Sequence, residues 1–168
     1  AAPASLATLV VDPESGQRKA WLAEVPPPLI ARWSAKEQYI AHVEQASVVM
    51  LVIGKSEIAR GRDAIWLIGH PIALISLLKG SAGEPDLARA AAALYLAMAQ
   101  SAVRVWFEHI ESHANWADEP SRELWASEFA RSDNFGCFPG QIPEWPSRGR
   151  QSGAGAPATW EKVLVGMV

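Results

Sequence analysis

The spacing of hydrophobic residues predicts a β-hairpin at the start of the chain. An apolar run over 6–11, rich in β-branched residues, stops at a turn cluster over 12–16 and resumes over 17–25. Two such runs around a glycine-containing turn are typical of a hairpin. Three prolines at 26–28 end the second strand, because proline has no N–H to donate to a ladder, and 29–33 is expected to form a short third strand.

Downstream of residue 33 the pattern alternates between helical and strand-like segments. Apolar residues at helical spacing, among them Ile40, Val43, Val48 and Leu51, predict a helix over 34–53. Runs over 64–68 and 103–110 predict strands. Segments 71–79, 85–101 and 117–131 predict helices, each with a proline near its start. This order predicts an α/β fold, a mixed five-stranded sheet covered by helices.

The end of the chain differs in composition from the rest. Residues 132–157 are rich in Pro, Gly, Ser and Arg, which predicts an extended arm and divides the chain into a domain over 1–131 and a tail over 132–168. The 168 residues include eight tryptophans. Six lie on or beside predicted elements and fit the core and edges of one domain. Trp145 and Trp160 lie in the tail, which is therefore expected to dock on this domain or on a protein partner.

Charge and cysteine content exclude several classes of protein. With 15 basic and 18 acidic side chains the net charge is −3, which argues against gripping nucleic acid by bulk charge, although not against a local basic face. A single cysteine, Cys137, excludes a disulfide framework and a cysteine-based zinc site. It indicates a reducing, intracellular compartment. No apolar stretch reaches the roughly 18 residues that span a membrane, so no membrane partner is expected.

Three acidic residues occupy informative positions. Asp12 ends the first strand, Glu44 lies within an apolar helical stripe, and Asp118 begins the last helix. Each has an ordinary alternative: turn chemistry for Asp12, snorkelling at a helix edge for Glu44, and a favourable helix dipole for Asp118. Together they predict convergence at one sheet edge, where oxygen ligands favour Mg²⁺ or Mn²⁺. A pair of such ions supports in-line phosphodiester cleavage.

The chain resembles the ribonuclease H domains that follow reverse transcriptases in retroelements, over about residues 6–131. The matching segments are LVVD at 9–12, YIAHVE at 39–44, IWLI at 65–68, ALISLLKG at 73–80 and NWADEPSR at 115–122. The last segment is the most specific. The resemblance implies a ribonuclease H-like fold and divalent-metal-dependent hydrolysis of the RNA strand of an RNA–DNA hybrid.

The resemblance also implies roles for individual residues. Asp12, Glu44 and Asp118 match metal-binding carboxylates of the family. His113 falls in the loop where family members often carry a mobile histidine that assists product release or proton transfer, and a solvated loop histidine is the alternative. Glu37, one heptad before Glu44, is the second choice for the helix carboxylate.

One position departs from the family pattern. The family has an aspartate directly after the fourth strand, where this chain has Gly69 followed by His70. Imidazole binds Mg²⁺ weakly, and Asp63 lies at the other end of that strand. The alternative function is therefore a catalytically inactive domain that serves as a binding or scaffolding subunit of a larger assembly. A relative of transposases and integrases is a third possibility.

Contacts to a hybrid duplex would fall on phosphates and 2′-hydroxyls, because such duplexes are recognised by shape more than by base edges. Basic residues beside the fourth strand and after the following helix are candidates for these contacts. They are Lys55, Arg60, Arg62 and Lys79. Their ordinary alternative is a solvated charged face.

Overall fold

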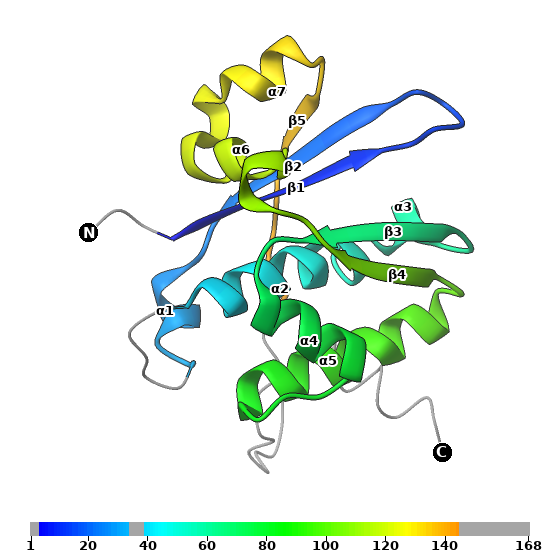
Figure 1. Cartoon of the computed structure of the whole chain (residues 1–168), viewed down its shortest axis with the longest axis vertical. Helices are drawn as coiled ribbons and strands as arrows, with labels where there is room; N and C mark the ends of the chain where they lie inside the picture. Colours follow the sequence, from blue (N-terminus) through cyan, green and yellow to red (C-terminus); the bar gives the residue numbers. More distant parts are fainter. Residues whose placement is uncertain (1–3, 34–38, 145–168) are drawn as a thin grey trace, which may run out of the picture.

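The computed structural model describes residues 4–33 and 39–144 and shows an α/β architecture (Figure 1). Its described strands are β1 (Ser5–Val11), β2 (Arg18–Glu24), β3 (Asp63–Ile68), β4 (Arg104–His109) and β5 (Gly136–Pro139). They form one three-stranded mixed sheet in the order β1-β2-β5 and one two-stranded parallel sheet of β3 and β4. The α/β class is thus confirmed, but the five strands lie in two small sheets rather than one.

Helices fill the connections. They are α1 (Pro27–Ile30), α2 (Ile40–Val52), α3 (Ser56–Ala59), α4 (Pro71–Lys79), α5 (Pro85–Gln100), α6 (Asp118–Glu123) and α7 (Glu128–Ser132), with 3-10 turns at Ser112–Ala114 and Leu124–Ala126. Prolines begin α4 and α5 as predicted, because the proline ring pre-sets the helical φ. Gly80 ends α4 with a φ of 63°, a left-handed conformation that glycine adopts without steric cost.

Two predicted elements are wrong. The expected strand over 29–33 is absent, because the prolines start the short helix α1, which buries Leu29 and leads into the buried Trp33. The helix expected over 117–131 is broken into α6, a 3-10 turn and α7. The break falls at Leu124, whose φ is 47°.

Part of the predicted tail belongs to the fold. Strand β5 pairs in parallel with β2, with Cys137 opposite Ala20. Phe135 is buried in a small cluster with Ala20, Leu22 and Ala130. The expected domain boundary at residue 131 therefore falls inside the folded region. Trp145, Trp160 and the docking predicted for them lie outside the described residues.

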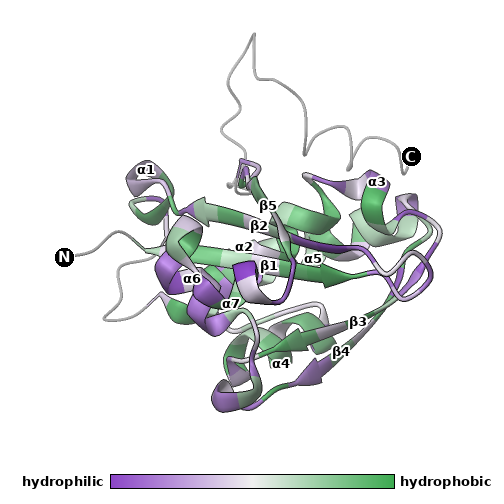
Figure 2. Cartoon of the chain, turned by 90° about the horizontal axis from the view of Figure 1, so that it is seen from above, coloured by the Kyte–Doolittle hydropathy of each residue, from purple (hydrophilic) through white to green (hydrophobic). Residues whose placement is uncertain are grey.

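Helix α2 is the centre of the core. It packs against β1, α4 and α5, and residues on every side of it are buried, which is typical of a fully enclosed helix (Figure 2). Trp21 and Trp33 are buried, whereas Trp106, Trp116 and Trp125 are each more than half exposed and do not serve the core. In the described part of the chain, no helix combines the length and hydropathy that crossing a membrane requires.

Candidate acidic site

Glu44 and Asp118 are brought together at the end of β3. Glu44 lies one turn into α2 and accepts a hydrogen bond from the Gly69 N–H, while Asp118 begins α6. Burial raises the pKa of Glu44 above its ordinary value, the Gly69 hydrogen bond opposes that rise, and the negative charge of Asp118 adds to it. The sequence-predicted pair therefore shares one electrostatic environment.

One carboxylate of this acidic pair, that of Asp118, already has a cationic partner. Arg122, one turn further along α6, approaches Asp118 with 2.8 Å between Nη2 and Oδ2. Asn115 accepts a hydrogen bond from the Ala117 N–H through Oδ1 at 3.0 Å, and its Nδ2 lies on the side of residue 69. The negative charge at the site is thus one half-buried carboxylate and one carboxylate paired with a cation.

Gly69 occupies the position from which a third acidic side chain would enter the site. A Cβ built on Gly69 would lie 3.2 Å from Asn115 Nδ2 and 3.4 Å from Glu44 Oε1. Gly16, Gly61 and Gly80 have positive φ, and Gly69 does not, so the backbone does not require glycine there. The φ of Gly69 therefore permits a side chain, but Asn115 would have to shift by a few tenths of an ångström to admit a Cβ there.

Asp12 lies at the opposite end of β1 from this pair. At the near end, the Ser5 hydroxyl donates to the Ser121 carbonyl oxygen of α6 at 2.6 Å. Asp12 follows Ser5 by seven positions, which is about 23 Å along a strand that rises about 3.3 Å per residue. The structure therefore does not bring Asp12 to Glu44 and Asp118.

Asp12 is bound instead by its own turn and by Arg62. Its Oδ2 lies 3.1 Å from Arg62 Nη1 and accepts from the Ser15 hydroxyl at 2.9 Å, and its Oδ1 accepts from the Glu14 N–H at 3.0 Å. The Ser15 hydroxyl, Arg62 and the Glu14 N–H together lower the pKa of Asp12 from 3.8 to about 2. This is the turn chemistry that an Asp-Pro sequence favours.

The residues present do not fit a pair of divalent ions. Residues 1–11 contain no acidic side chain, so β1 supplies no carboxylate at its end beside α6. Within residues 4–33 and 39–144, no three or more His, Cys, Asp or Glu side chains are grouped as metal ligands. Glu44 and Asp118 alone give too few oxygens to hold two cations about 4 Å apart.

The histidines contribute little to the pair. His113 is exposed in the 3-10 turn between β4 and α6, within the loop expected for it. His70 precedes α4, and burial lowers its pKa, which favours the neutral imidazole near pH 7. Glu37, the second choice for the helix carboxylate, lies outside the described residues.

The candidate phosphate contacts do not surround the acidic pair. Arg62 precedes β3 and is engaged by Asp12 and Glu14, whereas Gly69 lies at the other end of β3, seven positions and about 23 Å away. Lys55 lies three residues beyond the end of α2, and the eight helical positions from Glu44 to Val52 alone span about 12 Å. Arg60 ends α3 and Lys79 ends α4, both exposed.

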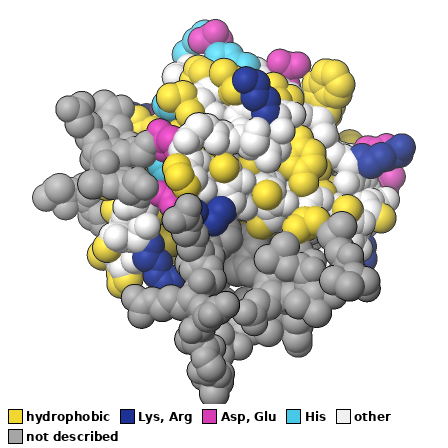
Figure 3. Space-filling view, turned by 90° about the horizontal axis from the view of Figure 1, so that it is seen from below, with side chains coloured by type: hydrophobic (Ala, Val, Ile, Leu, Met, Phe, Trp, Pro, Cys, Tyr) yellow, Lys and Arg dark blue, Asp and Glu magenta, His cyan; other side chains and the backbone are white. Residues whose placement is uncertain are grey.

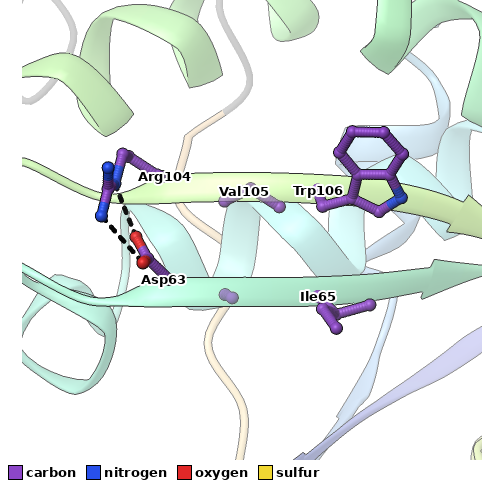
Figure 4. A pocket seen from close by; sticks show the side chains of 6 residues that line it. Asp63, Ile65, Arg104, Val105 and Trp106 are labelled. Carbon is purple, nitrogen blue, oxygen red and sulfur yellow. Dashed lines mark hydrogen bonds and ion pairs between the residues drawn. The ribbon is translucent and has the colours of Figure 1, made fainter.

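Sequence reasoning missed an exposed apolar face on β3 and β4. Ile65, Leu67 and Trp106 are 76%, 50% and 68% exposed on this face. At one end of it lies a shallow open pocket, where the Arg104 guanidinium binds Asp63 through Nε and Nη2 at 2.6 and 2.8 Å (Figure 4). The alternation of Arg104, Trp106 and Glu108 was the available signal, because charged residues two apart mark a solvent-facing side of a strand.

Comparisons with known proteins identify no relative of this chain. No protein-family model, no curated protein and no solved structure matches it.

Proposed function

We propose that this chain is a ribonuclease H-like domain without a complete catalytic metal site, and that it serves as a binding or scaffolding subunit of a larger assembly. The order of its elements supports the family assignment, as does the meeting of three positions at one place. Glu44 comes from the central helix, Gly69 follows β3, and Asp118 begins the helix after the β4 connection.

One observation argues against catalysis by two metal ions. Of the four acidic positions that the resemblance implies, Glu44 and Asp118 meet, position 69 has no side chain, and Asp12 binds Arg62 at the far end of β1. Hydrolysis by two ions requires carboxylates that hold both cations beside the scissile phosphate. The remaining pair, with Asp118 also bound to Arg122, does not meet that requirement.

Exposed apolar surface supports the binding role. Besides Ile65, Leu67 and Trp106, helix α4 carries an exposed stripe of Ile72, Ile75 and Leu78 on the side away from its buried residues. Hydrophobic side chains gather on the face seen from below, at the end of the molecule that α4 and α5 form (Figure 3). Contiguous apolar patches of this kind mark interaction sites on proteins.

The proposal is tested with a labelled RNA–DNA hybrid at micromolar protein in Mg²⁺ or Mn²⁺. The unmodified chain is compared with the double variant Glu44→Gln, Asp118→Asn, which removes both carboxylates of the pair. We expect no metal-dependent cleavage above that of the double variant. Cleavage that the unmodified chain shows and the double variant lacks would overturn the proposal and establish the active nuclease.

The active retroelement-type nuclease is the competing function, and the Glu44–Asp118 pair is the observation that favours it. A half-buried glutamate with a raised pKa beside a second carboxylate is costly, and such arrangements concentrate at functional sites. The same assay decides between the two functions.

A further inference from the structure

Strand β4 presents an open edge. Within residues 4–33 and 39–144 it pairs only with β3. The N–H of Arg104 donates to the Arg62 carbonyl at 3.0 Å, and the N–H of Ile110 donates to the Ile68 carbonyl at 3.1 Å. In a parallel ladder alternate residues face the partner strand, so the peptide groups of residues 105, 107 and 109 face away from β3. Unpaired strand edges are templates for another strand.

The side chains along this edge are complementary to their own reversed order. Arg104, Trp106 and Glu108 share the outer face of β4, with a cation at one end, a carboxylate at the other and the indole between them. An antiparallel copy of β4 centred on Trp106 brings Arg104 opposite Glu108 of the second copy, and Glu108 opposite its Arg104. The two Trp106 rings then lie opposite each other.

The backbone permits this register. Val105 then lies opposite Phe107 of the second copy, and both residues direct their peptide groups to the open edge, as a hydrogen-bonded antiparallel pair requires. Trp106 faces itself in a non-hydrogen-bonded pair, where opposing side chains are closest and aromatic pairs stabilise most. A register centred on Phe107 instead brings Trp106 opposite Glu108 and leaves Arg104 without a carboxylate.

The charges on β4 are available for this pairing. Arg104 binds Asp63 through Nε and Nη2, which leaves Nη1 for a second carboxylate, because a guanidinium carries five N–H donors. Glu108 lies on the same face and accepts from Trp106 Nε1 at 3.3 Å and from the His109 N–H at 3.1 Å. Both charged side chains are exposed.

We propose that β4 pairs antiparallel with β4 of a second copy of this chain, which joins the two two-stranded sheets into one of four strands. Such a dimer has two-fold symmetry, so the contact between Arg104 of one copy and Glu108 of the other occurs twice. The outer face of the joined sheet then carries Ile65 and Trp106 from both copies. This inference does not depend on whether the domain cleaves RNA.

Charge reversal tests the register. Sedimentation velocity of the full chain over a wide range of concentration measures the dimer dissociation constant. We expect Glu108→Arg and Arg104→Glu each to weaken the dimer about tenfold, since each change replaces two attractive cross-strand pairs with two repulsive ones. The double reversal restores it. Glu57→Arg, on the exposed surface of α3, serves as a matched control that leaves the dimer unchanged.

Cysteine cross-linking tests the centre of the pairing. In a Cys137→Ser background, Trp106→Cys is expected to form an intermolecular disulfide, because Cα atoms of a non-hydrogen-bonded pair lie about 4.5 Å apart. Leu67→Cys, on the same face of β3, is expected to remain reduced, because it lies about 20 Å from its equivalent, three strand spacings across the sheet and four residues along it. A chain that stays monomeric at every concentration, or a dimer that cross-links at residue 67 or 108 and not at 106, overturns the proposal.

Discussion

Asp12 and Arg62 form an ion pair, with 3.1 Å between Oδ2 and Nη1, that joins the end of β1 to the start of β3. The two residues adjoin different sheets, Asp12 after β1 and Arg62 before β3, and no hydrogen-bonded ladder connects those sheets among the described residues. The pair therefore links the two sheets directly through side chains. It also removes Asp12 from the acidic pair at the other end of β1.

Replacement of Asp12 by asparagine is expected to reduce stability at neutral pH. The folded-state pKa of Asp12 is lowered from 3.8 to about 2, so the ionised form stabilises the fold above pH 3.8, and this contribution disappears as the pH falls towards 2. Urea unfolding of both proteins across that range measures the effect. The two curves converge at the acid end, and a constant difference at every pH would contradict the assignment.

Glu44→Gln is expected to stabilise the protein at neutral pH by about 1 kcal/mol, the usual size for relieving an unfavourable functional group. The folded-state pKa of Glu44 is raised by burial, so its contribution is favourable at acid pH and is lost as the pH rises through the folded-state value. Glutamine keeps an acceptor for the Gly69 N–H. Thermal unfolding against pH measures the gain, and Glu57→Gln on exposed α3 is the control. A lower melting temperature for Glu44→Gln would contradict the prediction.

Gly69→Asp is expected to destabilise the metal-free protein by about 1–2 kcal/mol and to make its stability respond to Mg²⁺. The new Cβ lies 3.4 Å from Glu44 Oε1, so the added carboxylate repels an existing one until a cation binds between them. The melting temperature with and without Mg²⁺ checks this. Gly69→Asn matches the volume without the charge and should not respond. An aspartate variant insensitive to Mg²⁺ would show that position 69 does not point into the site.

Gln45→Ala is expected to cost about 2–3 kcal/mol of unfolding free energy. The fully buried Gln45 donates from Nε2 to the Ser76 hydroxyl and to the Leu87 carbonyl, both at 3.1 Å, and so links α2 to α4 and α5. Alanine removes both hydrogen bonds between the helices and opens a cavity. Chemical denaturation measures the loss, with Lys79→Ala on exposed surface as a control within about 0.5 kcal/mol. Equal stabilities for the two variants would refute the linking role.

Sequence patterns predicted the elements that depend on residues close together in the chain. The hairpin of β1 and β2, strands β3 and β4, and helices α4 and α5 follow from apolar periodicity and from prolines and glycines at their ends. The prediction of one helix over 117–131 was wrong, because a periodic pattern does not reveal a backbone break such as the one at Leu124. Strand β5 was missed because its pairing with β2 joins residues more than a hundred positions apart.

The sequence by itself determined which side chains this protein has for chemistry: Glu44 and Asp118 are present, and residue 69 has none. Only the tertiary structure decided which of them meet. Strand direction separates Asp12 from Glu44, because two ends of one strand cannot share a metal shell. The tertiary structure also decided that Trp106 faces solvent, since burial of a strand face depends on the elements that cover it and not on the strand's own residues.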